Sequence, residues 1–320
     1  MTSISKDLAQ AVRLLQADEL VAIPTETVYG LAGNIFSPPA IARIFALKQR
    51  PLFNPLIVHI PSIRQLAELA RYVPEKARWL AEAFWPGPLT LVLKKQPTVP
   101  DLITAGKDTV AVRVPNHPLV LALLAQVGFP LAAPSANPFG RISPTTAAHV
   151  EEYFGAALPM VLDGGDCERG IESTIVGFEG DEPVVYRLGS LAVEEIERVV
   201  GPVAIKNKKE AAPDAPGMLS RHYAPATPTY LAADPGAFIA RFADKKIGLL
   251  LFSKKVVGPF VDHQIVLSET GDLKEAASGL YGALHTLDKL GLDMIVAERM
   301  PDMGLGKSIN DRLERATKQR

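Results

Sequence analysis

The chain has 320 residues, long enough for two domains of ordinary size, and 48% of them are hydrophobic, as in a typical globular protein. Its formal net charge of −1 argues against a protein that coats nucleic acid by bulk electrostatics. A single cysteine, Cys167, excludes an internal disulfide framework and a cysteine-rich zinc site.

The first residues predict an amphipathic helix with Leu8, Val12 and Leu15 on one face, and they lack the apolar region of a secretory leader. No apolar stretch approaches the roughly 20 residues that a membrane-spanning helix needs. We therefore expect a cytoplasmic protein with no membrane partner.

Short apolar runs alternate with helical periodicity over residues 1–200, which predicts an α/β domain. The last two runs flank Glu179-Gly180-Asp181-Glu182 and predict an antiparallel hairpin, so we expect a mixed sheet. The segments predicted as strands are 20–23, 56–60, 89–93, 110–114, 131–133, 160–162, 174–178 and 183–187.

Several polar residues predict where the intervening helices begin. Ser37 followed by two prolines predicts a capped helix that ends at Leu47. Ser62 and Thr145 are the predicted caps of two later helices. Further helices are expected from Pro74 and over 119–127.

The composition changes near residue 206. Residues 206–228 are charged and rich in Ala and Pro without periodicity, which predicts an interdomain linker, and its lysines Lys206, Lys208 and Lys209 are interpreted as solvated. Apolar runs then alternate with helical segments again and predict a small parallel, Rossmann-like α/β domain. These runs are 229–232, 247–252, 264–267 and 294–297, with a long helix over 273–290. The predicted domains are therefore 1–205 and 229–320.

Polar motifs follow several apolar segments of the first domain. They are Pro24-Thr25-Glu26-Thr27-Val28-Tyr29-Gly30, Lys48-Gln49-Arg50-Pro51 and Ser135-Ala136-Asn137. Open α/β sheets bind ligands at strand ends, and two fixed cations with hydroxyl and amide donors suit phosphate oxygens. Taken singly, each motif has a simpler explanation, such as cations favoured at a helix C-terminus or ordinary turn residues.

Other polar residues leave alternatives open. Arg113, in a β-branched strand, either faces water or binds an anion in a cleft. His59 is either a core histidine or a hydrogen-bonding group, and a candidate proton acceptor, beside a substrate. Glu26 and Glu172 could orient basic groups or hold magnesium.

The motifs together resemble those of the threonylcarbamoyl-AMP synthase family in its long form, which joins a YrdC-like domain to a smaller C-terminal domain. Lys48/Arg50 and Ser135/Asn137 match the K-x-R and S-x-N pairs of the family. The other matching stretches are Asn54-Pro55-Leu56-Ile57-Val58-His59, Trp85-Pro86-Gly87-Pro88-Leu89-Thr90, Val112-Arg113-Val114-Pro115, Gly170-Ile171-Glu172-Ser173-Thr174 and Tyr186-Arg187.

The resemblance implies an enzyme that combines L-threonine, bicarbonate and ATP into threonylcarbamoyl-AMP and releases pyrophosphate, for threonylcarbamoyladenosine modification of tRNA. Such a reaction needs orientation and fixed positive charge rather than a covalent nucleophile. The catalytic residues implied are Lys48, Arg50, Ser135 and Asn137. The implied ATP ligands are Arg50, Asn54, Thr109, Ser135, Ser143, Arg187, His222 and Tyr223, and the implied threonine ligands are Thr27, His59, Arg113 and Ser173.

The linker contains the stretch Ala215-Pro216-Gly217-Met218-Leu219-Ser220-Arg221-His222-Tyr223-Ala224-Pro225. A simple tether is the usual explanation for such a segment. The resemblance instead implies a lid that shields a water-sensitive product, with His222 or Tyr223 touching the nucleotide. Leu219 and Ser220 depart from the basic and aromatic residues that the family has there.

Partners and alternatives follow from the same residues. No protein metal site is predicted, so Mg²⁺ would arrive with the ATP substrate. The product would pass to a tRNA threonylcarbamoyl-transfer complex, and the net charge predicts no strong nucleic-acid binding. A non-catalytic RNA-binding module is the alternative, which near-neutral charge disfavours. A related carbamoyltransferase would need cysteine zinc knuckles, for which one cysteine is insufficient.

Overall fold

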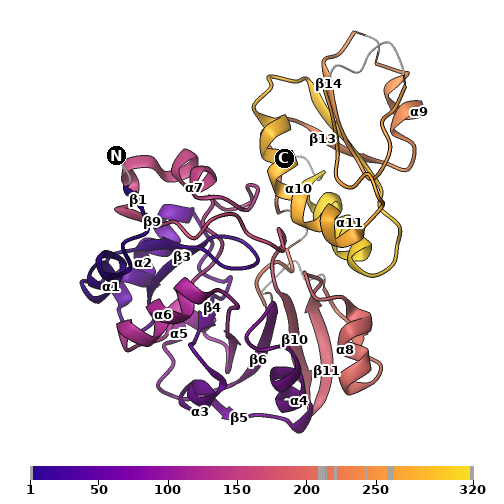
Figure 1. Ribbon diagram of the computed structural model, residues 1–320. Coiled ribbons are helices and arrows are strands. Elements are labelled where there is room, and N and C mark those ends of the chain that lie inside the picture. The colour runs from indigo at the N-terminus through magenta and orange to yellow at the C-terminus, as the bar shows by residue number, and fades with distance from the viewer. Residues whose placement is uncertain are drawn as a thin grey trace.

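The computed structural model describes residues 3–207, 213, 215–219, 222–242, 244–257 and 263–317. Four residues discussed above, Lys208, Lys209, Ser220 and Arg221, lie outside this set. The described chain forms one large mixed sheet and one small parallel sheet, both with helices (Figure 1). The predicted mixed α/β fold followed by a small parallel α/β domain is confirmed.

The large sheet has 12 described strands in the order β1-β9-β2-β3-β8-β4-β7-β6-β10-β11-β12, with β5 paired to β6. The predicted hairpin is confirmed, since β10 and β11 pair antiparallel. The strands are β1 Ser3–Ser5, β2 Val21–Ile23, β3 Gly30–Asn34, β4 Ile57–His59, β5 Ala70–Tyr72, β6 Leu89–Lys95, β7 Thr109–Arg113, β8 Leu131–Ala132, β9 Met160–Leu162, β10 Thr174–Glu179, β11 Glu182–Arg187 and β12 Ala204–Ile205.

Sequence patterns missed strands β1, β3, β5 and β12. Strand β3, Gly30–Asn34, contains two glycines in five residues, which hides its strand character. Because β3 pairs antiparallel with β2, the loop between them leads the chain directly from one strand into its neighbour. The first polar motif is therefore a tight connection between neighbouring strands.

The helices of the first domain fall mainly where the capping signals predict. Ser37 caps α2, accepting the N–H of Ala40 at 3.3 Å. Two predicted caps are wrong: Thr146, which has an extended backbone, caps α7 in place of Thr145, and Ser62 makes no side-chain capping bond. The helices are α1 Leu8–Gln16, α2 Pro38–Lys48, α3 Leu66–Leu69, α4 Glu75–Phe84, α5 Asp101–Thr104, α6 Pro118–Val127, α7 Ala147–Phe154 and α8 Val193–Val200, with 3₁₀ turns at Ile63–Gln65 and Gly155–Ala157.

Strand alternation divides the residues of the large sheet between its two faces. Residues such as Val58 and Val112 face the main core. On the opposite face, α1 and α6 cover the half around β2 and β9. The other half of that face is covered by the linker, whose Ala215 and Met218 pack on Ile57, Ala111, Ile175 and their neighbours.

The small sheet has the order β13-β16-β14-β15, and all its pairs are parallel. Helix α9 packs on one face, while α10 and α11 lie between the other face and the first domain (Figure 1). Leu280 and Ile309 share one core with Val28, Ile171 and Tyr223, so the two domains are joined by a continuous apolar contact. The elements are β13 Thr229–Ala232, α9 Pro235–Ile239, β14 Ile247–Leu251, β15 His263–Val266, α10 Leu273–Asp288, β16 Met294–Glu298 and α11 Leu305–Ala316.

No helix in the described part of the chain combines the length and the apolar character needed to cross a bilayer.

Candidate active site

A single pocket gathers side chains from the β2–β3 loop, the segment after α2, strands β4, β7 and β11, and the linker. Arg50, Arg113 and Ser135 all open into it, so the expectation that these distant residues converge is confirmed. The other predicted site residues in its lining are Thr27, His59, Ser173, Arg187, His222 and Tyr223.

Strand register places His59 directly beside Arg113, since β4 pairs in parallel with β7. Arg113 is 4% exposed, which decides against a water-facing side chain. Its guanidinium donates to Thr27 Oγ1 at 3.0 Å and to the carbonyl of Gly87 at 3.2 Å. It also lies 2.7 Å from Glu26 Oε1, which forms a buried ion pair.

The β2–β3 loop is held by a threonine. Thr25 Oγ1 accepts the backbone N–H groups of Thr27 and Val28 and donates to the carbonyl of Val28. The same hydroxyl lies 2.8 Å from Thr27 Oγ1. This turn directs the side chain of Thr27 toward Arg113. The hydroxyl oxygen of Thr27 can therefore accept a hydrogen bond from the guanidinium of Arg113.

Arg187 reaches the pocket because of a β-bulge. Ile175 pairs with Arg187 while Val176 pairs with Val185, which leaves Tyr186 as an extra residue on β11. The bulge returns Arg187 to the face that Ile175 occupies. There Arg187 donates to the carbonyl of Ser173 at 3.0 Å and to its Oγ at 2.9 Å.

The Lys48-Gln49-Arg50 motif separates its two cations. Gln49 has a left-handed backbone with φ 52°, and this turn ends α2. Lys48 is 1% exposed and donates its ammonium protons to the carbonyls of Ser135 and Asn137. Arg50 instead enters the pocket and donates to the carbonyls of Asn54 and Pro55. The Lys–Arg and Ser–Asn motifs are thus in direct contact.

Burial and mutual repulsion lower the pKa values of basic groups in and beside the pocket. Burial, with the charge of Arg50 second, lowers the pKa of Lys48 well below its usual value. Burial, with Arg187 second, lowers the pKa of Arg50 to about 9. Burial and then Arg113 lower the pKa of His59 to about 3, so its imidazole is neutral at pH 7. The concentrated positive charge suits an anionic ligand.

Five predicted residues do not line the pocket: Lys48, Asn54, Thr109, Asn137 and Ser143. Asn54 is fully buried, and its side-chain amide has no hydrogen-bond partner among the described residues. Asn137 donates to the carbonyls of Pro138 and Arg141. Thr109 lies on the same strand face as Arg113, but at the opposite end of β7.

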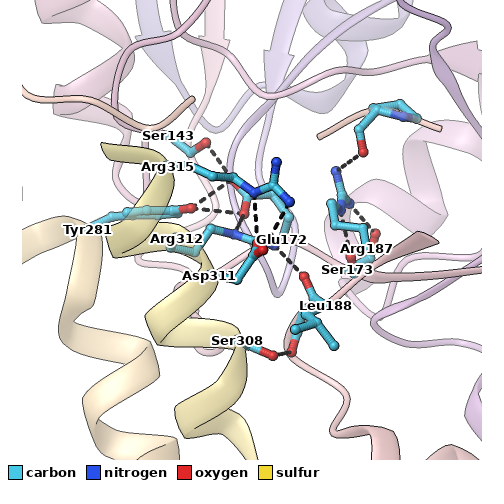
Figure 2. Close-up of polar contacts among 12 residues, drawn as sticks. Ser143, Glu172, Ser173, Arg187, Leu188, Tyr281, Ser308, Asp311, Arg312 and Arg315 are labelled. Atoms are coloured by element: carbon cyan, nitrogen blue, oxygen red, sulfur yellow. Dashed lines mark hydrogen bonds and ion pairs between the residues drawn. The ribbon is translucent and has the colours of Figure 1, made fainter. Parts of the chain in front are cut away.

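Glu172 lines the pocket and forms a buried network with the C-terminal domain (Figure 2). Its oxygens accept from Ser143 at 2.6 Å, from Tyr281 at 2.9 and 3.2 Å, and from Arg312 at 2.9 Å. Burial alone would raise the pKa of Glu172, but Arg312, Arg187 and the Ser143 bond outweigh it and lower the pKa to about 2.

These partners favour the orienting role that the sequence left open for Glu172, because protein donors occupy both oxygens. Within the ranges that the structure covers, no group of three or more His, Cys, Asp or Glu residues could hold a metal ion. Sequence reasoning missed Tyr281 and Arg312, since nothing in their local sequence signals contact with a residue more than one hundred positions earlier.

The linker closes the pocket. Pro216, Gly217, His222 and Tyr223 form part of its wall, and the carbonyl of Pro216 accepts from Arg187 at 3.4 Å. At Gly217, with φ +86°, an added Cβ would lie 2.7 Å from Arg187 Cδ, so the backbone approaches as only glycine allows. The cavity left beneath the linker is only about 50 Å³.

This fold and pocket define a two-domain α/β protein with a buried pocket lined by three arginines. The family model described as "Telomere recombination" matches residues 13–189, and that described as "Threonylcarbamoyl-AMP synthase, C-terminal domain" matches residues 191–317. The chain therefore belongs to the threonylcarbamoyl-AMP synthase family, as the resemblance predicted.

Individual relatives are similar in sequence to this chain over nearly its whole length. A threonylcarbamoyl-AMP synthase of Pyrococcus abyssi (strain GE5 / Orsay) is 42% identical over 317 residues, covering 96% of this chain and 93% of the relative. The enzyme of the same name from Bacillus subtilis (strain 168) is 40% identical over 319 residues, covering 97% and 92%. The crystal structure of P. abyssi Sua5 complexed with L-threonine matches with a TM-score of 0.91 and 41% identity, covering 97% of this chain and 94% of that one.

Proposed function

We propose that this chain condenses L-threonine, bicarbonate and ATP into threonylcarbamoyl-AMP in the pocket described above and releases pyrophosphate. The observation that carries this proposal is the convergence of Arg50, Arg113 and Arg187, from segments far apart in the chain, among buried hydroxyl groups. Such an array neutralises anions without supplying a covalent nucleophile.

The reaction follows from the charges. The threonine amine and bicarbonate form a carbamate with loss of water. A carbamate oxygen then attacks the α-phosphorus of ATP, the bond from that phosphorus to the bridging oxygen breaks, and pyrophosphate leaves. Two anions must approach each other, so fixed guanidinium groups lower the barrier by orientation and charge stabilisation.

The threonine side of the pocket is the wall around Arg113. Its guanidinium holds the threonine carboxylate, because a planar pair of N–H donors matches the two oxygens of a carboxylate. Thr27 and Ser173 offer hydroxyl groups to the amino acid. His59 supplies a hydrogen bond as a neutral ring, because a pKa of about 3 makes it a poor proton acceptor at pH 7.

The nucleotide side is the wall around Arg50 and Arg187. These residues, with Ser135, contact phosphate or ribose oxygens. Lys48 adds positive charge and holds the Ser135–Asn137 loop through its two carbonyl contacts. The other residues proposed on this side are Asn54, Thr109, Asn137 and Ser143.

The linker acts as a lid over this site. A cavity of about 50 Å³ is too small for a nucleotide, since small-molecule sites usually occupy about 300–1,000 Å³. The linker residues that line the pocket, Pro216, Gly217, His222 and Tyr223, must therefore move for ATP to enter. His222 and Tyr223 then close on the nucleotide and keep water from the adenylate product. We place this lid within a linker at 206–228, between domains 1–205 and 229–320.

The remaining expectations are part of the same proposal. Mg²⁺ arrives with the ATP phosphates, the product passes to a tRNA threonylcarbamoyl-transfer complex, and the protein works in the cytoplasm. The alternative of a non-catalytic RNA-binding module predicts salt-dependent tRNA binding without any threonine-dependent chemistry.

The direct test supplies purified protein with ATP, threonine and labelled bicarbonate. We expect a labelled adenylate together with pyrophosphate release that requires threonine. Detection must be rapid, since the product is unstable. Salt-sensitive tRNA binding with no such pyrophosphate release would favour the RNA-binding alternative.

Arg50→Ala tests the proposed nucleotide site. Removing its charge should lower threonine-dependent pyrophosphate release by about 100-fold or more, because a preorganised donor is lost beside the phosphates. Circular dichroism should confirm an intact fold. The matched control is Arg50→Lys, which keeps the charge and should retain part of the activity. Turnover of the alanine variant equal to the wild type would contradict the assignment.

A further inference from the structure

The C-terminal domain places a buried arginine directly behind the wall of the pocket. Arg312, in α11, is 1% exposed, and its Nε donates to Glu172 Oε2 at 2.9 Å (Figure 2). Its Nη2 donates to the carbonyl of Leu188, the residue that follows β11, at 2.6 Å. A buried arginine that reaches across a domain boundary in this way is costly unless all its protons are used.

Arg312 also supports the lid. Its Cζ lies 4.7 Å from the ring centre of Tyr223, in cation–π contact. Tyr223 lines the pocket and adopts a left-handed backbone with φ 64°. One guanidinium therefore touches two members of the pocket wall, Glu172 and Tyr223, without lining the pocket itself.

Neighbouring residues of α11 hold Arg312 and the linker in place. Asp311 accepts from Arg312 at 2.8 Å and from Arg315 at 2.9 Å. Arg315 then donates to the carbonyls of Leu219 and Asn207, which belong to the linker region. The network therefore reaches the lid at Leu219 and the start of the linker at Asn207.

We propose that Arg312 is a positioning residue: from the docked C-terminal domain it holds the carboxyl group of Glu172 and the ring of Tyr223 in place, so that the nucleotide side of the pocket is assembled only when the two domains are together. Through Glu172 it also fixes the hydroxyl of Ser143. The inference rests on the proposed function and extends it to the C-terminal domain.

The charge state of Glu172 gives this role a measurable signature. The ionisable groups that act on Glu172 come from both domains and the linker: Arg312, Tyr281, Arg187, Lys48, His222 and Tyr223. Without the guanidinium of Arg312, burial is opposed by fewer cations, and the pKa of Glu172 rises. Protonated Glu172 can no longer accept all of its hydrogen bonds.

The test compares Arg312→Met with the wild type over about pH 6 to 9, measuring kcat/KM for ATP. We expect a loss of about tenfold or more at pH 7 and a new acidic limb, so that activity falls as the pH falls. Adding Glu172→Gln should remove the new limb, because glutamine does not titrate. Arg312→Lys should restore part of the activity. A variant that is only less stable would lower kcat without changing the pH profile.

The matched control is Arg299→Met, in the same domain, which removes an exposed ion pair to Glu314. It should change neither kcat/KM for ATP at pH 7 nor the pH profile. If Arg312→Met does not fold, Tyr281→Phe decides, since it removes only a hydroxyl that donates to Glu172 and should produce a smaller acidic limb. Binding of ATP alone, measured by calorimetry over the same pH range, reports on the nucleotide side without requiring turnover. A wild-type pH profile in the variant that folds, with unchanged ATP binding, would overturn the proposal.

Discussion

At the scale of residues, Arg113 shows how one side chain can be held ready for a ligand. Its guanidinium donates to Thr27 Oγ1 and to the carbonyl of Gly87, and it forms an ion pair with Glu26, a neighbour of Thr27 in the β2–β3 loop. The ion pair is buried on both sides, so neither charge is solvated by bulk water. A threonine carboxylate would therefore enter a site whose donor is already oriented, which reduces the entropy lost on binding.

Arg113→Ala should weaken the use of threonine more than the use of ATP. Loss of a charge-assisted pair should raise the KM for threonine by about 10- to 100-fold, with a smaller change in the KM for ATP. Steady-state pyrophosphate release at varied concentrations of each substrate measures the two values. Arg43→Ala is the control, since it removes only exposed contacts, an ion pair with Glu19 and a hydrogen bond to the carbonyl of Asp18. Equal changes in both KM values would contradict the threonine role.

At the scale of elements, helix α2 begins at a predicted capping residue and ends at a predicted catalytic residue. Ser37 caps its first turn, and its last residue, Lys48, binds the carbonyls of the Ser135–Asn137 loop. A residue type that favours the N-cap position does not always form a capping hydrogen bond, however. Ser62 precedes a 3₁₀ turn and makes no side-chain capping bond, so residue type alone does not establish a cap.

Ser37→Ala should therefore lower the free energy of unfolding by about 1 kcal/mol, the usual value of an N-cap hydrogen bond. Urea denaturation monitored by circular dichroism gives the difference. Ser62→Ala is the matched comparison and should change the stability by much less, because no capping bond is lost. Equal losses in the two variants would show that the cap of α2 is not the cause.

At the scale of the whole molecule, the docking of the C-terminal domain depends on close backbone contact. Gly170, with φ +68°, packs against α10, and an added Cβ would lie 2.2 Å from the carbonyl oxygen of Ser278. The two domains also share an apolar core that includes Tyr223 of the linker. Movement of one domain should therefore move the lid.

Gly170→Ala should separate the domains. The clash should cost about 1–3 kcal/mol of docking free energy, beyond the roughly 1 kcal/mol of left-handed strain that any alanine carries there. We expect a larger radius of gyration by X-ray scattering, lower turnover and a shorter lifetime of the adenylate. Gly180→Ala is the control, with φ +63° and open space around the added Cβ. Equal effects of the two substitutions would attribute the loss to backbone strain alone.

The sequence by itself determined the fold class, most strands and the residues that bear charge. Apolar runs and caps report local periodicity, and the ordered motifs identified the family. Tertiary structure decided what the charged groups contact. A bulge brings Arg187 to the pocket face, Lys48 binds backbone carbonyls, and Arg312 reaches Glu172 from another domain. These contacts join residues far apart in the chain, and their geometry depends on register and docking, which local sequence patterns do not encode.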